Sequence, residues 1–179
     1  GAQIKASVLD EIVSDEPTNM QYLMLANLQD GIISDELPYL KGIDSKYEKY
    51  CIKNGSLVIS KNASPVKMAI VSVQEGNKIL ANGNLYVIEL DKDKINPYFL
   101  KAYLESESGK AALSRVAVGA TLLNLPVEGL KKVIIPLPDL ESQKKIADQY
   151  YAKLSEIKEL KYKLEKATEE LEHIYTEEK

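Results

Sequence analysis

The stretch that decides the fold reads GATLLNLPVEGLKKVIIPLPDLESQKKIA and spans residues 119–147. Within it, the β-branched run from Leu130 to Ile135 predicts a short strand. Pro136 and Pro138 end this strand, because proline has no N–H to donate to a β-ladder. Their fixed φ angles also make this segment a stiff joint between the strand and the residues beyond it.

The segment beyond the joint, residues 139–179, is free of Gly and Pro for 41 residues and is dominated by Lys, Glu, Leu, Ala and Tyr. This composition predicts one long helix, about 60 Å in length at ~1.5 Å per residue. Apolar residues recur along it at alternating spacings of three and four, which is a heptad seam. The seam consists of Ile157, Leu160, Leu164, Ala167, Leu171 and Ile174, and Ile146 and Tyr150 extend it upstream.

Such a seam needs something to cover it, because a single helix cannot bury a stripe against itself. We expect a partner helix from a second copy of the chain or from another protein. The alternative is that the helix folds back onto its own domain. Lys153 falls on the seam, so the regularity of the heptads fails at that point.

Residues 1–138 have the pattern of a β-rich domain, with short apolar runs separated by Gly, Asn, Asp and Pro. Besides the run already described, the candidate strands are Tyr22–Asn27, Leu57–Ser60, Lys67–Val73 and Leu85–Leu90. Asn96 and Pro97 are typical of a helix start, and Ser108-Gly109 predicts an interruption before a second helical stretch, Lys110–Val116. The expected fold is α+β: a mixed, β-rich domain at 1–138 with small helices, then one long coiled-coil helix at 139–179.

Length and composition exclude several classes of protein. With 179 residues and 45% hydrophobic content, the chain can bury one core but hardly two. It has no apolar run near the roughly 20 residues that span a bilayer and no secretory leader, so we expect a cytoplasmic protein without membrane contact. One Cys and one His exclude a Cys/His zinc site. We identify no catalytic residue and expect neither a metal nor a cofactor.

Charge is distributed unevenly along the chain. The net charge is -4 overall, but residues 1–50 sum to -5 and residues 51–118 to +3. In the basic segment, Lys and Arg alternate with Ser and Asn, a mixture that suits phosphate contacts and hydrogen bonds to base edges. The basic residues concerned are Lys61, Lys67, Lys101, Lys110 and Arg115.

Residues 119–147 resemble the end of a target-recognition domain from the specificity subunit of type I restriction-modification systems. The matching positions are Gly119, Thr121, Leu125, Leu130, Ile134, Ile135, Pro136, Leu137, Pro138, Leu140, Glu141, Gln143, Ile146 and Ala147. Ser142 separates Glu141 from Gln143, where the family has an adjacent pair. The segments 54–61 and 96–110 are also similar to the family, with Ser56 in place of its usual Asp.

The resemblance implies a DNA-reading module without catalytic activity. In that family, two such units read a bipartite target in double-stranded DNA, and their helices pack antiparallel as a spacer. The implied partners are methyltransferase subunits and, where present, restriction subunits. This chain has one unit, so its helix would pair with a second copy or with another half-subunit.

The resemblance also suggests which residues contact DNA. It places Ser60, Lys61 and Asn62 in one loop facing DNA and Gly119, Ala120 and Thr121 in another. Lys67, Lys110 and Arg115 would contact phosphates or bases.

Two alternatives stay open on the sequence alone. A coiled-coil interaction module whose β-rich domain binds a protein would fit the heptads and the acidic total equally well. An enzyme in its own right is the other, although the chain lacks the common catalytic motifs.

Overall fold

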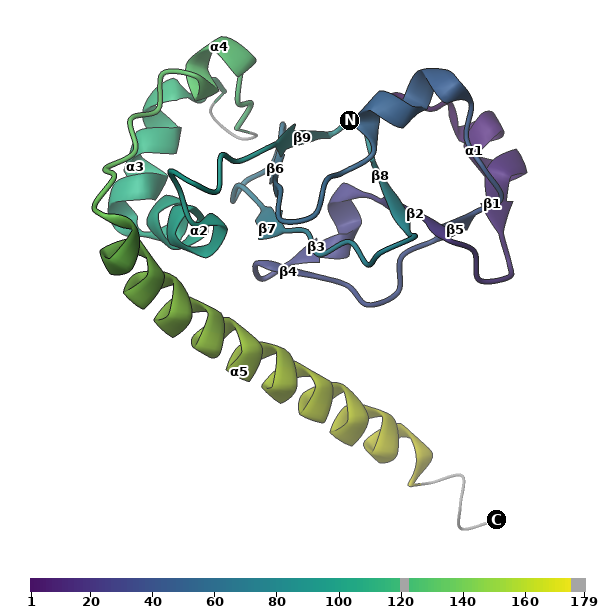
Figure 1. Ribbon diagram of the computed structural model, residues 1–179. Helices are drawn as coiled ribbons and strands as arrows, with labels where there is room; N and C mark the ends of the chain where they lie inside the picture. The colour runs from purple at the N-terminus through teal and green to yellow at the C-terminus, as the bar shows by residue number, and fades with distance from the viewer. Residues whose placement is uncertain (120–122, 175–179) are drawn as a thin grey trace.

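The chain folds into a β-rich domain from which one long helix extends (Figure 1). This computed structural model describes residues 1–119 and 123–174. Strands in three small sheets and several short helices form the described part of the domain, and α5 (Leu140–His173) follows it. The predicted α+β class with a long C-terminal helix is confirmed. Within the described ranges, no helix has the length and apolar character needed to cross a bilayer.

The larger sheet combines strands from the first forty residues with one from the middle of the chain. Its order is β1–β5–β2–β8, with bounds Val13–Ser14, Tyr39–Leu40, Met20–Leu23 and Lys78–Ala81. β2 and β8 run parallel, and the other neighbours are antiparallel. α1 (Ala6–Ile12) and the 3-10 helix η2 (Ser45–Tyr50) pack side chains against one face of this sheet.

β2 is shorter than the predicted strand Tyr22–Asn27. The Asn27 side-chain oxygen accepts a hydrogen bond from the Met24 backbone N–H at 2.9 Å, and this local bond turns the chain into the 3-10 helix η1 (Leu25–Asn27). A two-stranded hairpin follows, made of β3 (Leu28–Gln29) and β4 (Ile32–Ile33). β8 was not among the predicted strands.

The second sheet has the order β7–β6–β9, with bounds Met68–Ile70, Leu57–Ser60 and Leu85–Ile88. β6 has the predicted bounds, while β7 and β9 are shorter than predicted. All four residues of β6 are buried, and its three apolar residues alternate between two clusters of the core. Val58 packs with residues of both sheets, whereas Leu57 and Ile59 pack against the helices on the other side.

This alternation gives the domain its layers. A central apolar cluster that contains Leu23, Val58 and Ile79 lies between the two sheets. A second cluster lies under α1 and η2, and a third lies between the β7–β6–β9 sheet and the helices α2 and α3. Figure 1 shows these helices at the opposite end of the domain from α1.

α2 (Pro97–Glu105) begins at the predicted residue, because the Asn96 side-chain oxygen accepts hydrogen bonds from the N–H groups of Tyr98 and Phe99. The predicted interruption at Ser108-Gly109 is wrong. The break falls at Ser106, whose hydroxyl oxygen accepts from the Gly109 N–H and begins α3 (Glu107–Val116). Gly109 lies inside α3, where its lack of a side chain lets the helix approach α2.

The predicted strand at Leu130–Ile135 is also wrong. Residues Val127–Leu130 form the short helix α4, a turn follows at Lys131 and Lys132, and from Val133 the chain has no paired strand in the described part of the structure. Its side chains still alternate between the core and solvent. Val133 and Ile135 pack on the cluster between the β7–β6–β9 sheet and the helices α2 and α3, while Ile134 is 84% exposed. The periodicity of this run therefore reflects an extended chain that is held by packing and not by a β-ladder.

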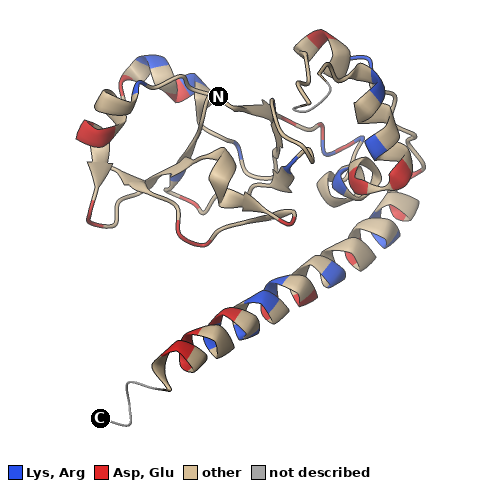
Figure 2. Cartoon of the chain, turned by 180° about the vertical axis from the view of Figure 1, so that it is seen from behind, with Lys and Arg blue, Asp and Glu red and all other residues tan. Residues whose placement is uncertain are grey.

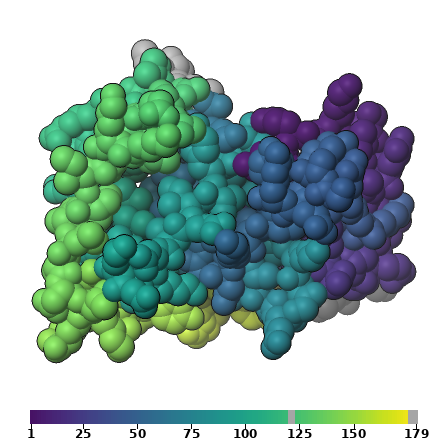
Figure 3. Space-filling model, turned by 45° about the horizontal axis from the view of Figure 1, so that its top comes forward, coloured from purple at the N-terminus to yellow at the C-terminus, as the bar shows by residue number. Residues whose placement is uncertain are grey.

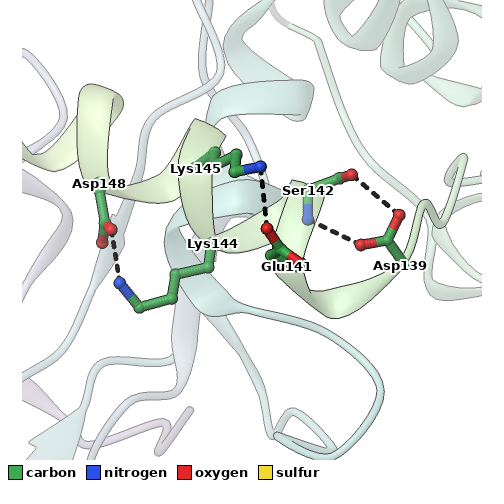
Figure 4. Close-up of polar contacts among 6 residues, drawn as sticks. All are labelled: Asp139, Glu141, Ser142, Lys144, Lys145 and Asp148. Carbon is green, nitrogen blue, oxygen red and sulfur yellow. Dashed lines mark hydrogen bonds and ion pairs between the residues drawn. The ribbon is translucent and has the colours of Figure 1, made fainter.

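α5 begins at a local capping motif (Figure 4). One carboxylate oxygen of Asp139 accepts from the Ser142 N–H and the other from the Ser142 hydroxyl, both at 2.9 Å. These bonds hold the pKa of the Asp139 carboxyl below its usual value. Two exposed ion pairs follow on the same helix, Lys145 with Glu141 and Lys144 with Asp148. In each pair the two partners are one helical turn apart.

Gln143 connects this helix start to the rest of the domain. Its side chain is 1% exposed, and its amide nitrogen donates to the carbonyl oxygens of Pro138 and Lys94 at 2.8 and 3.1 Å. Its amide oxygen accepts from the Asn96 N–H at 2.9 Å. One side chain thus satisfies three backbone groups from the proline segment and the start of α2.

We expect Gln143→Ala to lower the free energy of unfolding by about 2–4 kcal/mol, because an unpaired buried polar group costs about 1–3 kcal/mol. Urea denaturation followed by circular dichroism measures this change. Gln149→Ala, an exposed position on the same helix, is the matched control and should stay within about 0.5 kcal/mol of the wild type. Equal midpoints for the two variants would contradict the connecting role of Gln143.

The tight crossing of α2 and α3 gives a second prediction. A Cβ at Gly109 would lie 2.0 Å from the Tyr103 carbonyl oxygen, so Gly109→Ala should destabilise the protein by about 1–3 kcal/mol. Helix propensity alone predicts the opposite sign, since Ala is better than Gly by about 1 kcal/mol inside a helix. The exposed neighbour variant Ser108→Ala is the control, and thermal unfolding is the measurement. A raised Tm for Gly109→Ala would show that the crossing can relax.

Candidate nucleic-acid interface

Three segments that are far apart in the sequence meet at one end of the domain. The Lys61 N–H donates to the Asn84 carbonyl at 2.9 Å, and the Leu125 N–H donates to the Lys61 carbonyl at 2.8 Å. We call residues 61–63, 82–85 and 123–125 the polar end. Figure 3 looks onto this side of the molecule, where the surface is hollowed between the green segments of α3 and α4 and the blue and purple N-terminal segments.

Lys61 and Asn62 lie at the polar end, as the resemblance suggested for their loop. The Lys61 ammonium is 4.9 Å from the centre of the Tyr86 ring, and the Tyr86 hydroxyl donates to the Leu125 carbonyl at 2.9 Å. The lysine is therefore half-buried on an aromatic face, which holds its charge in one place. Asn62 is half-buried and forms an isolated β-bridge with Asn124.

Ser60 does not face solvent. It is 0% exposed, and its hydroxyl oxygen accepts from the Lys67 N–H at 3.0 Å. Its own N–H donates to the Lys67 carbonyl at 2.9 Å, so Ser60 closes the loop between β6 and β7 from inside the core. This corrects the expectation that Ser60 lies in the exposed loop.

A second loop begins beside the polar end. Val118 and Asn124 exchange two backbone hydrogen bonds of 2.8 Å, which bring the ends of this loop together. Gly119 is exposed and has a φ of 110°, in the region that favours glycine. The other two predicted contact residues of this loop, Ala120 and Thr121, lie outside the described residues.

The remaining basic candidates lie on different surfaces. Arg115 lines a groove of about 560 Å³ together with Lys132 and Ile134. Lys110 is exposed on the same helix but lies five residues away, about 140° around it, and does not line this groove. Figure 2 shows blue residues on α3 and on the chain that follows α4.

Lys67 and Lys101 belong to the side of the domain that faces α5. The pKa of Asp30 is lowered, mainly by a hydrogen bond from Lys161 of α5 and to a smaller extent by the charge of Lys67. Lys101 is fully buried between α2 and α5, so its ammonium group is withdrawn from the surface. Neither residue joins the polar end.

Two polar residues at this end were missed as candidates. Asn124 meets Asn62 across the isolated bridge, and the Gln3 amide nitrogen donates to the Gly83 carbonyl at 3.3 Å. Each is an ordinary polar residue in its own stretch of sequence. Only the backbone pairing between distant segments brings them to the predicted loop, so no local signal could have identified them.

The predicted pairing seam of α5 is largely exposed. The exposed fractions are 43% for Ile146 and Ile157, 56% for Leu160, 67% for Leu164, 68% for Leu171 and 60% for Ile174. Ala167 is also exposed. These seam positions present apolar side chains to solvent.

Tyr150 is the exception on this seam, because it contacts the domain of its own chain. Its hydroxyl accepts a hydrogen bond from Lys101 of α2 at 2.6 Å, and the residue is half-buried. Ala147 and Leu154 lie on the same side of α5, next to Gln143. The helix therefore has two distinct apolar faces. One contacts the domain along the first half of the helix, and the adjacent face carries the exposed seam.

The described ranges contain no group of three or more His, Cys, Asp or Glu side chains placed to bind a metal ion. Cys51 is a free, half-buried thiol, and burial raises its pKa. A thiol with a raised pKa is a poor nucleophile at neutral pH. The chemistry that this surface offers is hydrogen bonding and positive charge.

Comparisons with known proteins bear on the fold and the family of this chain. One solved structure, from work on the complex assembly and conformational transition of the type I R-M system, matches the fold with a TM-score of 0.62 and 18% sequence identity. The match covers 96% of this chain and 39% of the solved chain. Among the curated proteins, none matches. The family model described as "Type I restriction modification DNA specificity domain" matches residues 15–170, and this chain belongs to that family.

Proposed function

We propose that this chain is a sequence-specific DNA recognition subunit that directs methyltransferase subunits, and restriction subunits where present, to a bipartite target in double-stranded DNA. The family match over residues 15–170 carries this proposal. We assign the chain no catalytic step of its own and place it in the cytoplasm, where its DNA would be. Methylation of a base inside a duplex requires the partner enzyme to extract that base from the stack, which firm binding to the flanking DNA would support.

In this proposal, residues 1–138 form the recognition domain and read DNA through the polar end. Lys61, Asn62 and the loop Gly119–Thr121 would contact bases or backbone, with Arg115 on a phosphate beside them. Asn124 pairs with both Asn62 and Val118, so Lys61 and Asn62 lie next to the start of that loop, which supports the assignment. Ser60 is left out because it is buried, Lys110 because it does not line the groove beside Arg115, and Lys67 because its charge acts on Asp30, the partner of Lys161 on α5.

Residues 139–179 would form the spacer. A helix of fixed length sets the distance between two half-sites, so the separation of the recognised sequences becomes a geometric property of the protein. The exposed seam supports pairing with a second helix, supplied by another copy of this chain or by another half-subunit. The matched solved chain is more than twice as long, in keeping with a partner that supplies a second unit.

The decisive experiment coexpresses this chain with its neighbouring methyltransferase subunit and maps modified adenines across the host DNA. A bipartite palindromic motif would mean that two copies pair and each reads the same half-site. If the chain binds the methyltransferase but the complex neither modifies nor binds DNA, the proposal is overturned in favour of the protein-binding module.

We expect duplex binding by the assembled complex to weaken steeply as salt is added, because phosphate contacts release counterions. Arg115→Ala should reduce the slope of log affinity against log salt by about 1 per half-site. Fluorescence anisotropy on cognate and scrambled duplexes measures both effects. Lys46→Ala, an exposed lysine on η2, is the control and should leave the slope unchanged. A phosphate role for Arg115 fails if its slope equals that of the control.

The spacer role predicts that Leu164→Asp dissociates the paired helices without unfolding the domain, because Leu164 is 67% exposed. Sedimentation equilibrium should show a shift of the dissociation constant by at least tenfold. Tyr162→Asp places the same charge on the same helix at a residue that is 58% exposed but off the seam, and it should pair normally. Equal effects of both variants would argue against the heptad seam as the interface.

A further inference from the structure

A polar cluster around one buried lysine joins the long helix to the domain, and its other two members are half-buried. Lys101 of α2 is 0% exposed, and its ammonium donates to a Glu105 carboxylate oxygen at 2.8 Å and to the Tyr150 hydroxyl of α5 at 2.6 Å. The Tyr150 hydroxyl in turn donates to the other Glu105 oxygen. We call Lys101, Glu105 and Tyr150 the polar joint.

The turn between β3 and β4 closes over the polar joint from a third side. Gly31 has a φ of 76°, and a Cβ there would lie 2.6 Å from the Lys101 ammonium nitrogen and 3.2 Å from a Glu105 carboxylate oxygen. The neighbouring Asp30 pairs with Lys161, one of two ion pairs between this hairpin region and α5. The other joins Asp35 to Lys158 at 2.7 Å. Three elements therefore meet around one buried ammonium group.

Such a cluster differs physically from an apolar contact. Apolar contacts have no preferred direction, but a buried charge keeps its hydrogen bonds only in one arrangement of its partners. Removing one partner of a buried ion pair is strongly destabilising, whereas a well-packed apolar replacement would often be as stable. A charged cluster at this position therefore contributes mainly to a defined geometry.

We propose that the polar joint fixes the angle between the recognition domain and the spacer helix, and thereby selects the spacing of the two half-sites. This inference rests on the proposed function. Tyr150, Lys101 and Glu105 are positioning residues, since all three lie away from the polar end that would meet DNA.

The length of α5 makes its angle consequential. Its 34 residues extend about 51 Å at ~1.5 Å per residue. A tilt of about 5° at one end would move the other end by roughly 4 Å on a helix of this length. Successive base pairs are about 3.4 Å apart along the duplex. A variation of a few degrees in the angle at the polar joint would therefore change the distance between the two half-sites by about one base pair.

The first test measures the angle itself. Nitroxide labels at Asn54→Cys and Glu165→Cys in a Cys51→Ser background report the distance between domain and helix by pulsed electron paramagnetic resonance. Tyr150→Phe and, independently, Glu105→Gln should at least double the width of the distance distribution. Tyr151→Phe is the matched control: it loses a hydroxyl on the same helix but keeps the edge-on ring contact with Tyr98. Unchanged widths in both joint variants would overturn the inference.

The second test measures spacing on DNA. The paired complex with its methyltransferase subunit is offered a library of targets in which the two half-sites are separated by the cognate spacing or by one base pair more or less. The ratio of modification at cognate to altered spacing should fall at least threefold in the joint variants, with the bases preferred in each half-site unchanged. A broadened angle with an unchanged ratio would overturn the positioning role. A wild-type complex that modifies no target would instead overturn the proposed function, while the label distances would still show whether the joint holds the angle.

Discussion

The attachment of the long helix α5 to the domain depends on the three hydrogen bonds of the Gln143 side chain. This amide lies where the proline segment, the start of α2 and the first turn of α5 converge, and it pairs with one backbone group before α2, one at its cap and one in the proline segment. Pro136 and Pro138 lack N–H groups, so this segment cannot be held by a β-ladder. A side chain from the helix supplies the bonds that the ladder would have given.

Because α5 is anchored at its start, one of its faces is held against the domain and the adjacent face stays exposed. The face that carries Ala147, Tyr150 and Leu154 packs on the domain, and the adjacent face carries the exposed apolar seam. A helix that was covered all around could not serve as a spacer, and one that was free all around would have no defined angle to the domain. The observed division leaves the helix both fixed to its own domain and available to a partner.

The surface proposed to read DNA is formed by segments that are far apart in the sequence and meet only in the folded chain. Its residues come from the loop after β6, the turn between β8 and β9 and the chain that follows α3, joined by backbone bonds between Lys61, Asn84 and Leu125. The Tyr86 ring and Leu125 carbonyl hold this corner together from below. A surface assembled in this way can change its loops without disturbing the two sheets that support it.

The sequence by itself determined the features that rest on near neighbours. The caps at Asn96 and Asp139, the buried strand β6 and the long helix with its heptad seam all depend on residues within a few positions of one another. Such signals act through hydrogen bonds and side-chain periodicity within a single element, so the sequence displays them directly.

Tertiary structure decided the features that need distant partners. The run at Leu130–Ile135 begins in α4 and a turn, is extended only from Val133 and has no described strand beside it, and Ser60 is drawn into the core by the backbone of Lys67. Tyr150 leaves the seam because Lys101 offers its hydroxyl a buried charge to bind. In each case the partner that fixes the role of the residue comes from another part of the sequence, which no local pattern can specify.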